Sequence, residues 1–379
     1  MGDGERPLVI VRADGGLKLG HGHVRRCLNV AKFLRDEGFY VVFVLRDSDS
    51  GLLSLVRHSR FEIIELSARS DPGVHAFVSD VGEKEFTGMV QDAEKTAQMV
   101  ACHLPGRSVS WVITDHLCIR SPWQAAFRAL TQCRVLAIDG QANYAHDADI
   151  LIDPQLSDAP LEKWQTLIPD NCRIFSGPAY IPLSGPFTAA RNTAAVRSHP
   201  ISRILICFGG SEIQSVVVRT VRLVSDWLAL RYQRGITVDV VIPETAPCRD
   251  EVVQGFGRHP QLTVHSGIDD LAQLMLGASL AIGGGGIMMW ERCLLGLPAI
   301  VVPLAPNQAD PIRKIAEKGG VLALRSLDQT YEQDLRVALD EIADDPAVLE
   351  TLSNNAFAVM NGWPATRGWL DLMKSLSNE

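Results

Sequence analysis

The segment Gly20-His21-Gly22-His23 contains residue types suited to acid–base chemistry, because an imidazole can take up or release a proton near neutral pH. It follows the apolar run Leu8–Val11, which we expect to be a buried strand, and precedes apolar residues at helical spacing. His23 therefore stands where a loop enters a helix, beside unpaired backbone N–H groups and the positive end of the helix dipole. Such a helix start also favours anions such as a diphosphate. The segment predicts a general base next to a phosphate-binding pocket.

Three other interpretations of the histidine segment are open. The glycines could form a dinucleotide-binding turn, but the third glycine is missing and the loop after the strand is long. His21 and His23 could be two metal ligands, with the shell completed by Asp115, His116 or His146. In the third interpretation the glycines make a turn and the histidines cap the helix, with no chemical role.

Four consecutive glycines, Gly283 to Gly286, form a second candidate binding segment between the apolar run Leu280–Ile282 and a helical pattern. Their lack of side chains would let a diphosphate approach the amides at the helix start. Glu291, about two helical turns further on, could accept the hydroxyls of a ribose. A close contact between helix and strand also needs small residues, and this explains one or two glycines better than four. A third segment, Pro303–Gln308, ends another expected strand with groups that suit sugar or phosphate oxygens.

Composition limits the class of protein. The chain has 379 residues, of which 46% are hydrophobic, and this length predicts two domains with separate cores. The net charge of −8 and the lack of a Lys/Arg-rich run argue against nucleic acid as a partner. No apolar run reaches the roughly 18 residues of a membrane span, and the polar N-terminus does not suit a signal peptide. The eight cysteines include no Cys-x-x-Cys pair, which is typical of a reduced, cytoplasmic protein. Composition does not determine the oligomeric state.

Apolar runs alternate with amphipathic segments along the chain, which predicts an α/β protein with parallel sheets. The expected strands are Leu8–Val11, Tyr40–Leu45, Phe61–Leu66, Ser110–Thr114, Val135–Ile138, Ile150–Ile152, Arg203–Phe208, Thr237–Ile242, Leu262–His265, Ser279–Ile282, Ala299–Pro303 and Gly320–Leu324.

The proline-rich stretch Ser176–Ser202 has little periodicity and divides the chain. We predict a first domain over 1–182, a linker over 183–202, a second domain over 203–350, and a helical segment over 351–379 that could cross back to the first domain. Each half begins with a strand and a glycine-containing turn. The fold class is therefore two doubly wound, Rossmann-like domains facing a central cleft, with ligands at the carboxyl ends of the strands.

Taken together, these segments resemble the nucleotide-sugar hydrolases of pseudaminic acid biosynthesis, which act on UDP-2,4-diacetamido-2,4,6-trideoxy-β-L-altropyranose. More distantly, the chain is similar to glycosyltransferases of GT-B fold. The most specific matches are Arg12-Ala13-Asp14, Gly20-His21-Gly22-His23 and the block Gly285–Gln308. Supporting matches are Ile113–His116, Leu136–Asp139, Ala148–Leu151, Gly177–Tyr180 and Cys207–Ser211.

The resemblance implies a GT-B fold and an enzyme that hydrolyses a UDP-linked amino sugar at its anomeric carbon, with inversion. It implies no metal or other cofactor, and a small-molecule nucleotide sugar as partner. His23 would be the catalytic base, with Asp14 near it in the pocket. The implied substrate-binding residues are Arg12, Gly20, Gly22, Asp115, His116 and Tyr180 in the first domain and Gly209, Gly210, Ser211, Ile268, Gly285, Gly286, Ile287, Glu291, Asn307 and Gln308 in the second.

Within that set, the resemblance assigns separate parts of the ligand to separate residues. Gly209–Ser211 would meet the diphosphate, the backbone of Ile268 the uracil, Glu291 the ribose, and Asn307-Gln308 the sugar.

Three positions depart from the family pattern. Met288-Met289 replaces hydroxyl residues, Leu117 replaces a tyrosine, and Ser184 replaces an arginine. Each of these three changes at a polar position would cost affinity for an unchanged substrate, so the sugar or the nucleotide can differ. The fold does not distinguish water from an acceptor hydroxyl as nucleophile. An inverting glycosyltransferase is therefore the alternative function, and a non-catalytic nucleotide-sugar-binding protein is a second one.

Overall fold

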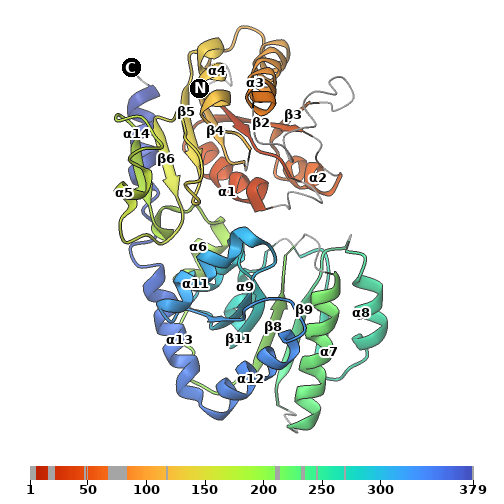
Figure 1. Ribbon diagram of the computed structural model, residues 1–379. Helices are drawn as coiled ribbons and strands as arrows, with labels where there is room; N and C mark the ends of the chain where they lie inside the picture. The colour runs from red at the N-terminus through yellow and green to blue at the C-terminus, as the bar shows by residue number, and fades with distance from the viewer. Residues whose placement is uncertain are drawn as a thin grey trace. The chain divides into compact units, whose positions relative to one another are not determined.

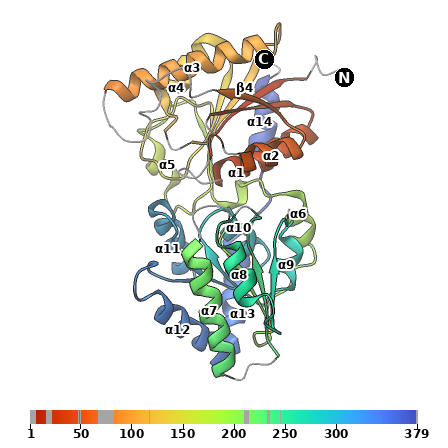
Figure 2. The same ribbon diagram turned by 90° about the vertical axis from the view of Figure 1, so that its right-hand side faces the viewer.

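The computed structural model describes residues 6–15, 22–46, 48, 50–66, 83–116, 118–209, 214–231, 235–244, 246–268 and 270–377. The chain divides into two compact units. Unit 1 consists of Met1–Pro182 with Trp363–Glu379, and unit 2 of Leu183–Gly362. Each unit is built from a parallel sheet with helices on both of its faces (Figure 1 and Figure 2).

The described part of unit 1 contains a seven-stranded sheet of order β3-β2-β1-β4-β5-β6-β7, and its neighbouring strands run parallel. The order reverses between β1 and β4, so the loops that leave these two neighbours turn to opposite faces of the sheet. The strands are β1 (Leu8–Arg12), β2 (Tyr40–Arg46), β3 (Glu62–Leu66), β4 (Val109–Thr114), β5 (Arg134–Ile138), β6 (Ile150–Asp153) and β7 (Arg173–Ser176).

Helices cover this sheet on both faces because its central strands are mostly apolar and are buried on both sides. One apolar cluster joins the sheet to α1 (Gly22–Asp36), α2 (Ser50–His58) and α14 (Arg367–Ser377). The cluster on the opposite face includes residues of α3 (Glu83–His103), α4 (Ser121–Thr131) and α5 (Pro160–Trp164). In α14, Trp369 packs edge-to-face on Phe33, and Lys374 Nζ lies 2.6 Å from Glu37 Oε2. The last helix of the chain thus completes the core of the first unit.

Unit 2 has a six-stranded sheet in its described part, of order β10-β9-β8-β11-β12-β13, again with parallel neighbours and a reversal at β8 and β11. Its strands are β8 (Arg203–Cys207), β9 (Thr237–Val241), β10 (Leu262–His265), β11 (Leu280–Gly284), β12 (Ala299–Val302) and β13 (Leu322–Ala323). Its helices are α6 (Gly185–Arg191), α7 (Gln214–Leu230), α8 (Arg249–Phe256), α9 (Ala272–Gly277), α10 (Ile287–Leu294), α11 (Ala309–Glu317), α12 (Tyr331–Asp344) and α13 (Pro346–Val359).

Every strand expected from the sequence overlaps a strand of the structure, and β7 is one that the sequence analysis missed. The segment of β7 is four residues long and none of them is fully buried, so it lacks the apolar run of the inner strands. The proline-rich stretch Ser176–Ser202 is also more structured than its prolines suggested. It holds a short 3-10 turn at Pro178–Tyr180 and the helix α6, which has Pro186 in its first turn, where a missing N–H costs nothing.

Candidate functional site

In unit 1, acidic residues stand at the carboxyl ends of four adjacent strands. Asp14 comes two residues after β1, Asp115 directly after β4 and Asp139 directly after β5, while Asp153 is the last residue of β6. The reversal of strand order between β1 and β4 leaves a place at this edge for a ligand or a side chain. The N-terminal turn of α1, which carries His23, supplies that side chain.

His23 bonds to Asp115. Its Nδ1 lies 2.6 Å from Asp115 Oδ1, and the carboxylate is fully buried while the imidazole is partly exposed. A carboxylate only accepts hydrogen bonds, so Nδ1 carries the proton and donates it. In the neutral ring the other nitrogen, Nε2, then holds a lone pair that can accept a proton. The pair has the geometry of a general base oriented by a buried carboxylate.

Arg26 fixes the position of that carboxylate. Its Nε lies 2.6 Å from Asp115 Oδ2 and its Nη2 lies 2.6 Å from Asp115 Oδ1, a two-pronged contact. Burial by itself would raise the pKa of Asp115, but the charges and hydrogen bonds of Arg26 and His23 outweigh it and hold that pKa below its usual range. Asp115 is therefore an anion whose charge faces the His23 ring.

Asp14, which we expected beside His23, has other partners. Its carboxylate bonds to the Arg12 guanidinium and accepts the Arg46 backbone N–H at 2.7 Å. His116 Nε2 lies 3.2 Å from the second oxygen of Asp14. Burial would raise the pKa of Asp14, but Arg12 and His116 lower it below the usual range. Asp14 is thus a buried anion of the strand-end framework.

Arg12, expected to bind substrate, is itself buried and is held by two carboxylates. In addition to Asp14, its Nε and Nη2 contact the Asp92 carboxylate at 3.3 and 3.2 Å. Arg46 Nε and Trp123 Nε1 donate to the same carboxylate at 2.9 and 2.8 Å. This network ties β1 and β2 to α3 and α4, so the donors of Arg12 are used within unit 1.

The other expected residues of unit 1 are spread over its surface and core. Gly22 is the exposed first residue of α1, and His116 also accepts the Cys118 backbone N–H at 2.9 Å. Tyr180 packs edge-to-face on Phe175 and joins the apolar cluster of α14. Gly20, His21 and Leu117 lie outside the described residues. Among the residues that are described, no three His, Cys, Asp or Glu side chains gather as a metal site would require.

In unit 2, most of the four-glycine run is explained by packing, contrary to our expectation. A Cβ on Gly283 would lie 2.2 Å from the Cys207 carbonyl oxygen, and one on Gly285 would lie 2.5 Å from Ile312. A Cβ on Gly284 would lie 2.7 Å from Leu304. Only the fourth differs. Gly286 is exposed, has nothing within 4 Å of its Cβ position, and is the N-cap of α10.

Gln308 closes one side of this turn. Its Oε1 accepts the backbone N–H groups of Gly285 and Leu304, both at 3.1 Å. The Gly285 amide, expected to meet a diphosphate, is therefore engaged inside unit 2. The accessible backbone at the start of α10 begins at Gly286, followed by the half-buried Ile287. Anions are favoured at such a helix start.

The remaining expected residues of unit 2 surround the ends of its strands. Gly209 follows β8 with a φ of +99°, and Met288 Cε lies 3.3 Å from its Cβ position, so the thioether covers this turn. Glu291 is buried in α10, Ile268 is half-buried after β10, and Asn307 is exposed. Ser184, noted above as a departure, is the N-cap of α6. Gly210 and Ser211 lie outside the described residues.

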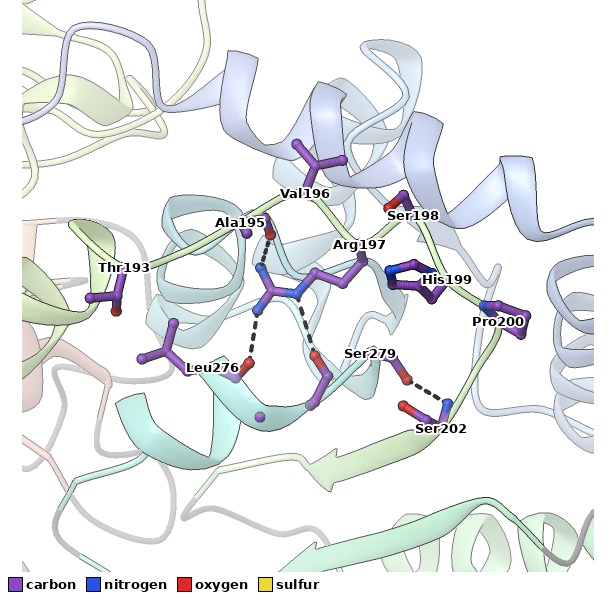
Figure 3. Close-up of a pocket in the computed structure, with 12 residues that line it drawn as sticks. Thr193, Ala195, Val196, Arg197, Ser198, His199, Pro200, Ser202, Leu276 and Ser279 are labelled. Carbon is purple, nitrogen blue, oxygen red and sulfur yellow. Dashed lines mark hydrogen bonds between the residues drawn. The ribbon is translucent and has the colours of Figure 1, made fainter.

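A hollow in unit 2 lined by residues 193–202 and 276–279 has a structural role (Figure 3). Arg197 extends along this hollow, and its guanidinium donates to four backbone carbonyls. The acceptors are Ala195 at 2.8 Å, Met275 at 3.2 Å, Leu276 at 3.3 Å and Leu295. The last three lie at the C-terminal ends of α9 and α10, where a cation is favoured. Burial lowers the pKa of Arg197 to about 10.

Two residues of these sites escaped the sequence analysis. Arg26 is three residues after His23, and this spacing puts both on one face of α1, a signal that was present in the sequence. Arg292 lies directly after Glu291 in α10, and its buried position under the glycine turn has no comparable local signal.

Known proteins resemble this chain both in the sequence of unit 2 and in the fold of the whole chain. Residues 204–362 match the Glycosyltransferase family 28 C-terminal domain, which spans the strands and helices of unit 2 from β8 to the end of α13. Acinetobacter baumannii MurG has a similar structure, with a TM-score of 0.60 and 17% identity over 97% of this chain and 99% of that one. The calicheamicin glycosyltransferase CalG4 matches with a TM-score of 0.64 and 15% identity over 99% of both chains. The chain has the GT-B fold.

Two curated proteins align with most of this chain at low sequence identity. The spore coat polysaccharide biosynthesis protein SpsG of Bacillus subtilis is 20% identical over 83% of both proteins. An uncharacterized protein of Methanocaldococcus jannaschii, MJ1062, is 22% identical over 78% of this chain, and the chain spans only 55% of that relative. These findings place the chain among glycosyltransferase-like proteins of GT-B fold. In the described part of the chain, no helix is long and apolar enough to cross a bilayer.

Proposed function

We propose that this protein is an enzyme that transfers a sugar from a nucleotide-activated donor to an acceptor hydroxyl, with inversion at the anomeric carbon. The observation that carries the proposal is the bond between His23 Nδ1 and the buried Asp115 carboxylate, which leaves Nε2 to act as a base. Support for the nucleotide-sugar donor comes from unit 2, which matches the family 28 C-terminal domain and has an open helix start at Gly286.

The reaction is a single displacement. His23 Nε2 takes the proton of the acceptor O–H as that oxygen forms a bond to C1 of the sugar. The bond from C1 to the diphosphate oxygen breaks on the opposite face, and its electron pair leaves with the nucleoside diphosphate. Attack opposite the leaving group inverts C1. Asp115 stabilises the imidazolium, which later releases its proton to solvent.

The same chemistry with water as nucleophile is the second candidate. It is favoured by the motif Arg12-Ala13-Asp14 with Gly20-His21-Gly22-His23, in which the chain resembles nucleotide-sugar hydrolases. In that case the donor would be a UDP-linked 2,4-diacetamido-trideoxy sugar, and the product a free sugar for the biosynthesis of a pseudaminic-type nonulosonic acid. The similarity to a spore coat polysaccharide biosynthesis protein supports a role in making surface polysaccharide for either nucleophile.

Acceptor-free turnover distinguishes the two. The purified protein would be incubated with EDTA and a panel of nucleotide sugars that includes UDP-2,4-diacetamido-2,4,6-trideoxyhexoses. Nucleotide release and the anomer of any free sugar would be followed by NMR. Nucleotide binding without release supports the transferase and starts a search for its acceptor. Rapid release of inverted free sugar, abolished in His23→Asn, identifies the hydrolase instead. Absence of binding to every donor would contradict both.

A further inference from the structure

Arg292 is a buried cation beneath the glycine turn of unit 2. The residue is 1% exposed, and its Nη2 donates to the carbonyl oxygen of Gly284 at the end of β11. Its Nη1 lies 2.5 Å from the position that a Cβ on Gly283 would occupy. Its Nε is buried and has no hydrogen-bond acceptor among the described residues. The guanidinium therefore contacts the turn with part of its bonding capacity unused.

Two other arginines, the buried Arg12 and the partly exposed Arg26, show what Arg292 lacks. The guanidinium of Arg12 is paired with Asp14 and Asp92, and that of Arg26 with Asp115. No carboxylate in the described part of the chain forms an ion pair with Arg292. Burial lowers the pKa of its guanidinium, and the charge of the neighbouring Glu291, which acts in the opposite direction, does not outweigh it. A buried charge without a counter-ion is costly to a folded protein. This cost would be offset by an anion that arrives with the ligand.

The place for that anion is the start of α10. The Gly284 carbonyl that Arg292 holds is two residues before Gly286, the exposed N-cap of the helix. The unpaired N–H groups and the dipole at this helix end attract negative charge. The guanidinium adds a full positive charge behind the same turn, where the surrounding protein screens it less than water would.

We propose that Arg292 is the positioning residue and buried counter-charge for the diphosphate of the nucleotide. It acts through the turn, by holding the Gly284 carbonyl inward so that the amides from Gly286 onward face the ligand, and its charge attracts the diphosphate from behind. This inference rests on the proposed function, since it needs a ligand that carries a diphosphate at unit 2.

The test compares charged and uncharged forms of one ligand. Wild-type protein, Arg292→Met and Arg292→Lys would be titrated calorimetrically with UDP, GDP, CDP, ADP and dTDP, with the matching nucleosides, and with inorganic pyrophosphate. Arg292→Met is expected to bind the preferred nucleoside diphosphate and pyrophosphate about 10- to 100-fold more weakly, with its nucleoside affinity unchanged. Arg292→Lys, which keeps the charge, should retain most of the diphosphate affinity.

Arg197→Met is the matched control, because Arg197 is another arginine of unit 2 whose partners are backbone carbonyls, at the opposite end of α10. It should lower stability and leave diphosphate affinity unchanged. Diphosphate affinity that is the same in Arg292→Met as in wild type overturns the inference, as does an equal loss for nucleoside and diphosphate. If Arg292→Met does not fold, the test depends on Arg292→Lys. A roughly 10- to 100-fold loss of diphosphate affinity in Arg292→Lys would then overturn the inference.

Binding to the wild-type protein distinguishes a wrong role for Arg292 from a wrong proposed function. Wild-type protein that binds a nucleoside but gains nothing from its diphosphate contradicts the role of Arg292 alone. Wild-type protein that binds no nucleotide and no pyrophosphate contradicts both the inference and the proposed function.

Discussion

His23 Nδ1 lies 2.6 Å from Asp115 Oδ1, although 92 positions separate the two residues in the chain. The helix start that carries His23 and the strand end that carries Asp115 meet where the strand order of unit 1 reverses. Arg26, on the same helix face, holds both oxygens of the carboxylate. The imidazole is thereby oriented from behind, with Nε2 left to the reaction.

Replacement of His23 by asparagine should lower turnover about 10²- to 10⁴-fold, the usual contribution of a general base, while nucleotide binding stays near the wild-type value. Turnover would be measured on the donor identified by the panel, and binding by calorimetry. His58→Asn, the same change at an exposed histidine of α2, is the control and should be silent. Turnover near the wild-type level in His23→Asn would exclude His23 as the base.

Asp115→Asn should reduce turnover and also destabilise unit 1. The substitution removes the charge that stabilises imidazolium and leaves the Arg26 guanidinium without its counter-ion. Removing one partner of a fully buried ion pair costs about 3–5 kcal/mol, and a smaller loss is expected here because Arg26 is partly exposed. Urea unfolding measures the loss of stability, and kcat of the folded variant is measured under native conditions. An Asp115→Asn protein as stable and as active as wild type would contradict both roles.

The same pair predicts a pH dependence of stability. The pKa of Asp115 is lower in the folded protein than its ordinary value of 3.8, so the unfolded chain binds the proton more readily. The stabilisation is complete above that ordinary value and is lost as the pH falls through the lower, folded-state pKa. The difference in unfolding free energy between wild type and Asp115→Asn should therefore shrink as the pH falls below that ordinary value. A difference that grows on acidification over this range would reverse the assigned sign.

Two alanine substitutions in the glycine run should behave in opposite ways. Gly283→Ala forces a Cβ against the Cys207 carbonyl and should cost about 1–3 kcal/mol or more. Gly286→Ala meets open space and should cost less than about 1 kcal/mol, as expected at an N-cap. Because its methyl group projects where a diphosphate would approach, Gly286→Ala should nevertheless weaken nucleotide binding. Thermal unfolding and calorimetric titration of both variants check this, and equal stabilities would refute the packing argument.

Arg197→Met should destabilise unit 2. The guanidinium bonds carbonyls at the ends of α9 and α10, and its loss leaves several buried acceptors unsatisfied, at about 1–3 kcal/mol each before relaxation. A fall in the melting temperature is expected, together with faster proteolysis of the segment over residues 193–202. A melting temperature equal to that of wild type would show that the segment is held in another way.

Sequence alone determined the alternation of strands and helices, the two parallel-sheet units and the placement of a histidine at a helix start. These features depend on apolar periodicity and on glycines within a few residues of one another, which are local properties. Tertiary structure decided which carboxylate meets that histidine. Asp14, Asp115 and Asp139 all stand at neighbouring strand ends, and only the packing of α1 on the sheet pairs Asp115 with His23.

Tertiary contacts also decided how two groups expected to bind substrate are used, because hydrogen-bond partners from distant parts of the chain reach them. The donors of Arg12 could have faced a substrate, but Asp92, 80 positions away, bonds them. The Gly285 amide could have met a diphosphate, but the Gln308 carbonyl accepts it. Side chains far apart in the chain compete for the same hydrogen-bonding groups, and local spacing carries no record of which one is within reach. The sequence therefore predicts the fold and the types of chemical group at its site, whereas the tertiary structure decides their pairing.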